Sequence, residues 1–66
     1  MKVLFVDIFS NNILEISRQI TVEECILAIK RFCREHSVYI TALNKATFEN
    51  YYIIDIGSRN YFFVIK

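Results

Sequence analysis

The chain has 66 residues, of which 55% are hydrophobic and 23% charged, and its formal net charge at pH 7 is +1. This length predicts a single domain, residues 1–66, that buries only about 60% of its unfolded surface. Such an apolar composition excludes a disordered chain, and no apolar run approaches the roughly 18 residues of a membrane span. The basic residues form no stripe of the kind that binds nucleic acid, and the small net charge favours self-association.

The first part of the chain predicts a β-hairpin. Residues 2–9 (KVLFVDIF) are rich in Val, Ile and Phe, as strands are. Residues 10–12 are typical of a turn, and residues 13–18 predict a second strand that pairs with the first. Asp7 interrupts the apolar start and no small-residue cleavage site follows, so we expect no signal peptide and a cytoplasmic location.

The strongest local signal is a helix start. Thr21 followed by Glu24 matches a capping box, and Ile20 is placed to pack on the first turn. We expect the helix to continue to about His36. On a helical wheel, one arc of about 120° holds the apolar residues Val22, Cys25, Ile26, Ile29, Phe32 and Cys33.

The remaining sequence predicts three more strands. Residues 37–43 (SVYITAL) have the β-branched content of a strand, and residues 44–50 are expected to form a loop. Residues 51–56 and 61–65 predict a hairpin joined by a tight turn that holds the only glycine. The expected fold is α+β: an antiparallel four- to five-stranded sheet with a single helix packed on one face, in the order β-β-α-β-β-β.

The two cysteines are expected to be reduced core residues. Cys25 and Cys33 are eight residues apart, which is about 12 Å along a helix and too far for a disulfide. Cys33 and His36 lack further residues at metal-ligand spacing, so no metal site is predicted. Because the only glycine lies in a hairpin, there is no phosphate-binding loop, and no cofactor is expected.

Two carboxylates lie within apolar strands. If the strands of Asp7 and Asp55 were neighbours, the pair would be able to hold a divalent cation, as in a minimal nuclease. However, no Lys or His accompanies either residue in the sequence, and no nucleophile has a His and an orienting acid at a suitable spacing. Two solvated polar positions are the simpler interpretation, so the protein is not expected to be an enzyme.

The strands are apolar on both sides, whereas one helix covers only one side of a sheet. In the last hairpin, alternation places Tyr51 and Phe62 on the side away from the helix. In the first strand, we expect Leu4 and Val6 to face the helix and Phe5 to face away. The predicted partner-binding residues are therefore Phe5, Tyr39, Tyr51 and Phe62, with Leu27 as a second contact on the polar side of the helix.

A large exposed apolar patch on a soluble protein usually marks an interface. We therefore expect a small non-catalytic protein-binding module that forms a homodimer or binds an unidentified host or cognate protein. Many residue types with AT-rich codons, such as Ile, Asn and Lys, favour an AT-rich bacterium or a phage as the source, and an inhibitor or regulator as the role.

Two alternatives remain open. Aromatic residues on an open sheet can stack bases, which suggests a nucleic-acid or small-nucleotide binder at an oligomer interface, although only Lys2, Arg59 and Lys66 are expected near the strand ends. In the other alternative, the loop 44–50, with Phe48, or the segment 10–20 folds over the apolar face and covers it within the chain.

Overall fold

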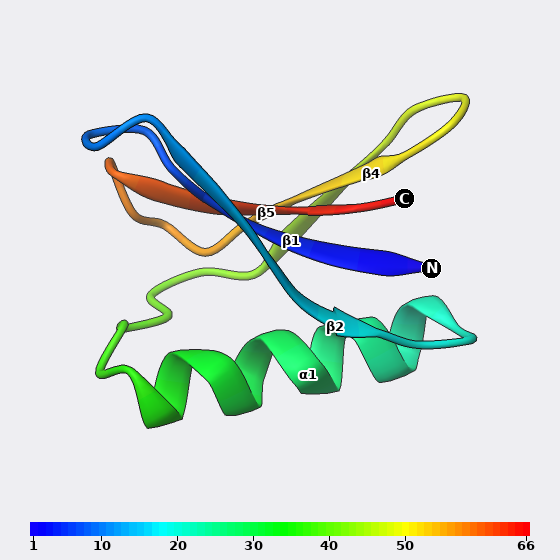
Figure 1. Ribbon diagram of the computed structural model, residues 1–66, viewed down its shortest axis with the longest axis horizontal. Coiled ribbons are helices and arrows are strands. Elements are labelled where there is room, and N and C mark those ends of the chain that lie inside the picture. Colours follow the sequence, from blue (N-terminus) through cyan, green and yellow to red (C-terminus); the bar gives the residue numbers. More distant parts are fainter.

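One helix and five strands form two layers in the computed structural model, which describes all residues, 1–66 (Figure 1). The elements are β1 (Lys2–Asp7), β2 (Asn12–Arg18), α1 (Val22–Glu35), β3 (Asn44–Thr47), β4 (Tyr52–Asp55) and β5 (Tyr61–Ile65). All neighbouring strands are antiparallel, and their order in the sheet is β2-β1-β5-β4-β3. The predicted α+β fold and element order are confirmed.

The helix begins and ends where its capping residues predict. The Thr21 hydroxyl accepts a hydrogen bond from the Glu24 backbone N–H at 3.2 Å and donates one to the Glu24 carboxylate at 3.0 Å. The helix ends at Glu35, and the N–H of the C-cap residue, His36, donates to the Phe32 carbonyl. The predicted staple is wrong, because the Ile20 side chain is 86% exposed; the capping hydrogen bonds fix the first turn without it.

The core lies between α1 and the sheet face that α1 covers, which we call the inner face. It is thin, because only eight residues are buried: Val3, Cys25, Ile29, Cys33, Ile54, Ile56, Phe63 and Ile65. Aromatic rings extend it toward the end of the helix, with the Phe5 ring 4.9 Å from that of Phe32 and 5.3 Å from that of Phe63. Both predicted cysteine positions and the apolar arc of the helix are therefore confirmed.

The predicted faces of β4 and β5 are correct, but those of β1 are inverted. Residues directly opposite each other in antiparallel strands point to the same face. Phe5 lies opposite the buried Phe63, and Val3 lies opposite the buried Ile65. Val3 and Phe5 thus face the helix, and Leu4 and Val6 face away. Both sets are apolar, so alternation within β1 alone does not determine which set is buried; the register with its neighbouring strands does.

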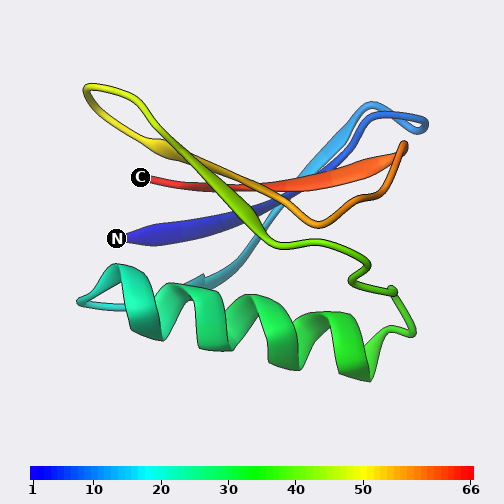
Figure 2. The ribbon, with the colours of Figure 1, turned by 180° about the vertical axis from the view of Figure 1, so that it is seen from behind.

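The predicted strand at residues 37–43 is also wrong, and the segment is irregular. Only the Thr41 and Ala42 amides bond to the sheet, and both donate to the single carbonyl of Ile56. Val38 and Ile40 pack against the core, which explains the β-branched composition without a ladder of hydrogen bonds. The segment connects the end of α1 to the far edge of the sheet along one side of the molecule (Figure 2).

Gly57 permits the close approach of this segment to the sheet. Its backbone φ is 81°, which L-residues with a side chain rarely adopt. A Cβ at this position would also overlap the Thr41 hydroxyl. Glycine is therefore required here both by the conformation of the β4–β5 turn and by the packing of residue 41 against it.

The strand that was expected at residues 37–43 is instead β3, which lies within the expected loop 44–50. It pairs with β4 from Asn44 opposite Asp55 to Thr47 opposite Tyr52. The chain reverses at Phe48, whose N–H donates to the Tyr51 carbonyl at 2.9 Å. Its sequence, NKAT, has low intrinsic strand preference, so the hairpin with β4 determines its conformation.

Candidate interaction surface

The sheet face opposite α1, here called the outer face, is apolar and carries no second layer. Neither Figure 1 nor Figure 2 shows any element above it. The strand register aligns Leu4, Val64 and Ile53 in one row across three strands, and Val6 with Phe62 in the next. Its apolar members are Leu4, Val6, Ile13, Ala46, Ile53, Phe62 and Val64.

The apolar surface continues from the outer face onto the β1–β2 turn. Ile13 lies opposite Val6 and is 69% exposed, and Ile8, the residue that follows β1, is 55% exposed. Phe9, at the tip of the turn, is 87% exposed. The Asp7 carboxylate holds this turn by accepting a hydrogen bond from the Ser10 N–H at 3.2 Å, so the exposed apolar residues sit on a defined turn.

A basic row borders the outer face at one end. Lys2 and Lys66 are directly opposite each other, and each N–H donates to the other's carbonyl, at 2.7 and 3.0 Å. Arg18 lies on the other side of Lys2. Like charges placed opposite each other on neighbouring strands destabilise a sheet, and neither lysine has an ion-pair partner within the chain.

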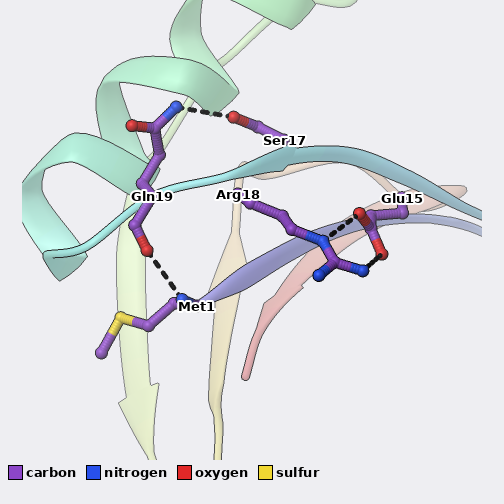
Figure 3. A network of polar contacts seen from close by, with 5 residues as sticks. All are labelled: Met1, Glu15, Ser17, Arg18 and Gln19. Atoms are coloured by element: carbon purple, nitrogen blue, oxygen red, sulfur yellow. Dashed lines mark hydrogen bonds and ion pairs between the residues drawn. The ribbon is translucent and has the colours of Figure 1, made fainter.

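Arg18, by contrast, has an acidic partner within its own strand. Its Nε donates to the Glu15 carboxylate at 2.8 Å (Figure 3), and this hydrogen bond lowers the pKa of Glu15. Beyond Arg18, the Gln19 side chain donates to the Ser17 hydroxyl at 2.8 Å, and the Gln19 carbonyl accepts from the Met1 nitrogen at 2.7 Å. These contacts fasten the end of β2 to the start of β1 and leave Lys2 and Lys66 as the unpaired cations of the rim.

An acidic residue lies at the opposite end of the outer face. Asp55 is opposite Phe62, two rows from the lysine pair, and is exposed. One of its oxygens accepts a hydrogen bond from the Gly57 N–H at 2.9 Å, and no cation of the chain pairs with it. The outer face thus has two lysines without an ion-pair partner at one end, an apolar centre, and Asp55, also without an ion-pair partner, at the other end.

The structure brings only part of the predicted partner-binding set together. Phe62 lies on the outer face, on the middle strand β5 and in the same row as Asp55. Tyr51, just before β4, lies at the other end of this face and stacks on Phe48 at 4.8 Å. Phe5 was assigned to the wrong face and packs under α1. Tyr39, 83% exposed, is in the irregular segment, and Leu27, 60% exposed, points outward from α1.

Sequence reasoning missed the contribution of β1 to the outer face. Leu4 and Val6 are central to it, yet they were expected to face the helix. Glu15 provides a signal that would have helped, since a charged residue in a strand usually marks the solvent side. Because Glu15 lies opposite Leu4, its hairpin register identifies the outward side of β1.

The covering of the outer face by the chain itself is not observed. Phe48 is 46% exposed and packs on Tyr51 at the β3–β4 turn, and the segment 10–20 supplies edge strand β2 of the same sheet. No other segment of the chain therefore covers the apolar centre of the face, although its side chains half-bury one another: Leu4, Val6, Ile53, Phe62 and Val64.

Other candidate sites are not assembled by the fold. Asp7 is on the inner side opposite Tyr61, whereas Asp55 is on the outer face, and β5 separates their strands. No three His, Cys, Asp or Glu side chains lie close enough to hold a metal ion. The His36 ring lies 4.3 Å from the Phe32 ring, and burial raises the pKa of both Cys25 and Cys33.

The expected cations for nucleic-acid binding are also divided between two ends of the sheet. Lys2 and Lys66 lie side by side at one end of β5, and Arg59 lies in the turn that precedes the other end of β5. A phosphate backbone usually meets a continuous basic surround, which this arrangement does not provide. α1 is too short and polar to cross a lipid bilayer.

Comparison with protein-family models, curated proteins and solved structures gives no match to this chain.

Proposed function

We propose that the protein is a non-catalytic protein-binding module and that its outer face is the docking surface. The observation that carries this proposal is the row of apolar side chains across the strands with no layer above it. Leu4, Val64 and Ile53 are adjacent in the register, with Val6 and Phe62 beside them. In soluble proteins, such continuous apolar patches mark interaction sites.

The energetics support an interface over a bare surface. At roughly 25 cal/mol per Å², covering about 500 Å² of apolar surface contributes on the order of 10 kcal/mol before association costs are subtracted. Phe62 is the candidate anchor, because aromatic side chains bury a large area at a low entropy cost. It lies on β5, which is the middle strand of the sheet.

Site-specific photo-crosslinking in cells that express the chain tests this proposal. We expect p-benzoylphenylalanine in place of Phe62 to give a discrete crosslinked product on irradiation, because a docked partner covers this position. The same group in place of Leu27 is the matched control, since Leu27 is exposed on the outward side of α1. Equal crosslinking at both positions, or none at Phe62, would contradict the proposal.

A further inference from the structure

We infer that the occupant of the outer face is a second copy of this chain, docked sheet on sheet with its strands antiparallel to those of the first. This inference rests on the proposed function, because it names the partner of the same surface. The two faces would be related by a two-fold axis, as in most homodimers, and separated by about 10 Å as in β-sandwiches.

The thin core is the first argument for a second copy. Only eight of 66 residues are buried, all between α1 and the inner face. Small domains of this size have little stability to spare. A second copy is the partner that is present wherever the chain is made, and it would complete the core on the outer side. The net charge of +1 opposes this approach only weakly.

The distribution of charge on the outer face is the second argument, and it selects the orientation. Lys2 and Lys66 lie at one end of the face and Asp55 at the other. With parallel strands, the lysine pairs of the two copies would meet and repel. With antiparallel strands, the lysine end of each copy lies over the Asp55 end of the other, so the unpaired charges complement each other twice.

The sheet edges suit a second copy less well than the face. β2 carries the Glu15–Arg18 ion pair, and its register with β1 is interrupted by a bulge. β3, at the other edge, has four residues, and Lys45 lies over the Tyr52 ring. Short strands, bulges and charged side chains are features that oppose edge-to-edge pairing.

The oligomeric state of the purified chain tests whether a second copy occupies the outer face. We expect light scattering after size exclusion to show a dimer that dissociates on dilution between about 500 µM and about 1 µM. Phe62→Glu is expected to raise the dimer dissociation constant at least about 30-fold, as for an interface anchor. Leu27→Glu, which adds the same charge on the opposite side of the molecule, should leave it unchanged.

The orientation is tested by neutralising each end of the face. Asp55→Asn keeps an oxygen for the Gly57 N–H while removing the charge. It should weaken the dimer about three-fold, and the double variant K2Q/K66Q should weaken it similarly. The triple variant should weaken the dimer little more than Asp55→Asn or K2Q/K66Q does alone, because the two variants remove the same contacts between charges. A tighter dimer with K2Q/K66Q would overturn the antiparallel orientation, since it would mean that the lysines face each other.

These results separate the partner from the surface. A monomer at every concentration, or a dimer that Leu27→Glu dissociates and Phe62→Glu does not, overturns the inference of a second copy. If Phe62 still crosslinks to a different protein in cells, the docking surface stands and only its occupant changes. Circular dichroism of each variant establishes that the helix and sheet are retained.

Discussion

Cys25 and Cys33 place two thiols in the only buried core of the molecule. They are 0% and 2% exposed, respectively, on the face of α1 that meets the sheet. Burial removes solvent from the thiolate and so raises the pKa of both side chains. Both groups therefore stay protonated and act as small apolar side chains within the core.

We expect this burial to be measurable in two ways. A thiol reagent should label both cysteines slowly without denaturant and rapidly once the chain unfolds. Because their pKa is higher in the folded chain, their contribution to stability is complete below the unfolded pKa of about 8.5 and is lost as the pH rises through the folded value. Urea unfolding across this pH range should show a decrease in the free energy of unfolding as the pH rises, and this decrease should be smaller in Cys33→Ala. Rapid labelling of both thiols in the native chain would contradict the packing.

At the scale of single elements, α1 was predicted most completely, because its signals are local. A capping box and a 3.6-residue apolar period are contained within fifteen residues and need no knowledge of the rest of the fold. The Thr21 and Glu24 side chains make the expected contact, and the predicted arc is the buried one.

The start of this helix provides a direct measure of capping. Thr21→Ala should lower the free energy of unfolding by about 1 kcal/mol, because the Glu24 N–H loses its acceptor. Thr21→Ser, which keeps the hydroxyl, is the control and should stay close to the wild type. Urea denaturation at a fixed protein concentration compares the three chains, and equal stability of wild type and Thr21→Ala would mean that another residue caps the helix.

The strands show what local sequence does not determine. Residues 37–43 have strand composition, but their backbone amides reach the sheet only at the Ile56 carbonyl. By contrast, β3 has weak strand preference but pairs along its whole length with β4. In β1, alternation predicts two faces without saying which is inside, and a change of one residue in register exchanges them. This ambiguity misplaced Phe5, and with it part of the candidate surface, while Phe62 was placed correctly because Gly57 marks its hairpin turn.

At the scale of the whole molecule, the two faces of the sheet divide the apolar residues between folding and association. The inner face joins the aromatic rings of Phe5, Phe32 and Phe63 into the core. The outer face has mainly aliphatic side chains around Phe62, bordered by unpaired charges. A substitution on the inner face should therefore affect the stability of each chain, and one on the outer face should affect the contact between chains.

Thermal unfolding at several protein concentrations separates these two effects. If a dimer is the folded species, the wild-type Tm should rise by about 5 °C for each ten-fold increase in concentration, because dissociation accompanies unfolding. Phe62→Glu should lower the Tm and remove this dependence. Phe5→Leu replaces the ring packed against Phe32 with a smaller aliphatic side chain. It should lower the free energy of unfolding by about 1 kcal/mol and leave the dependence of Tm on concentration as in the wild type. Two results would contradict this division between an inner face that stabilises the chain and an outer face that mediates association. One is a wild-type Tm that is the same at all concentrations; the other is a concentration dependence that Phe5→Leu abolishes and Phe62→Glu retains.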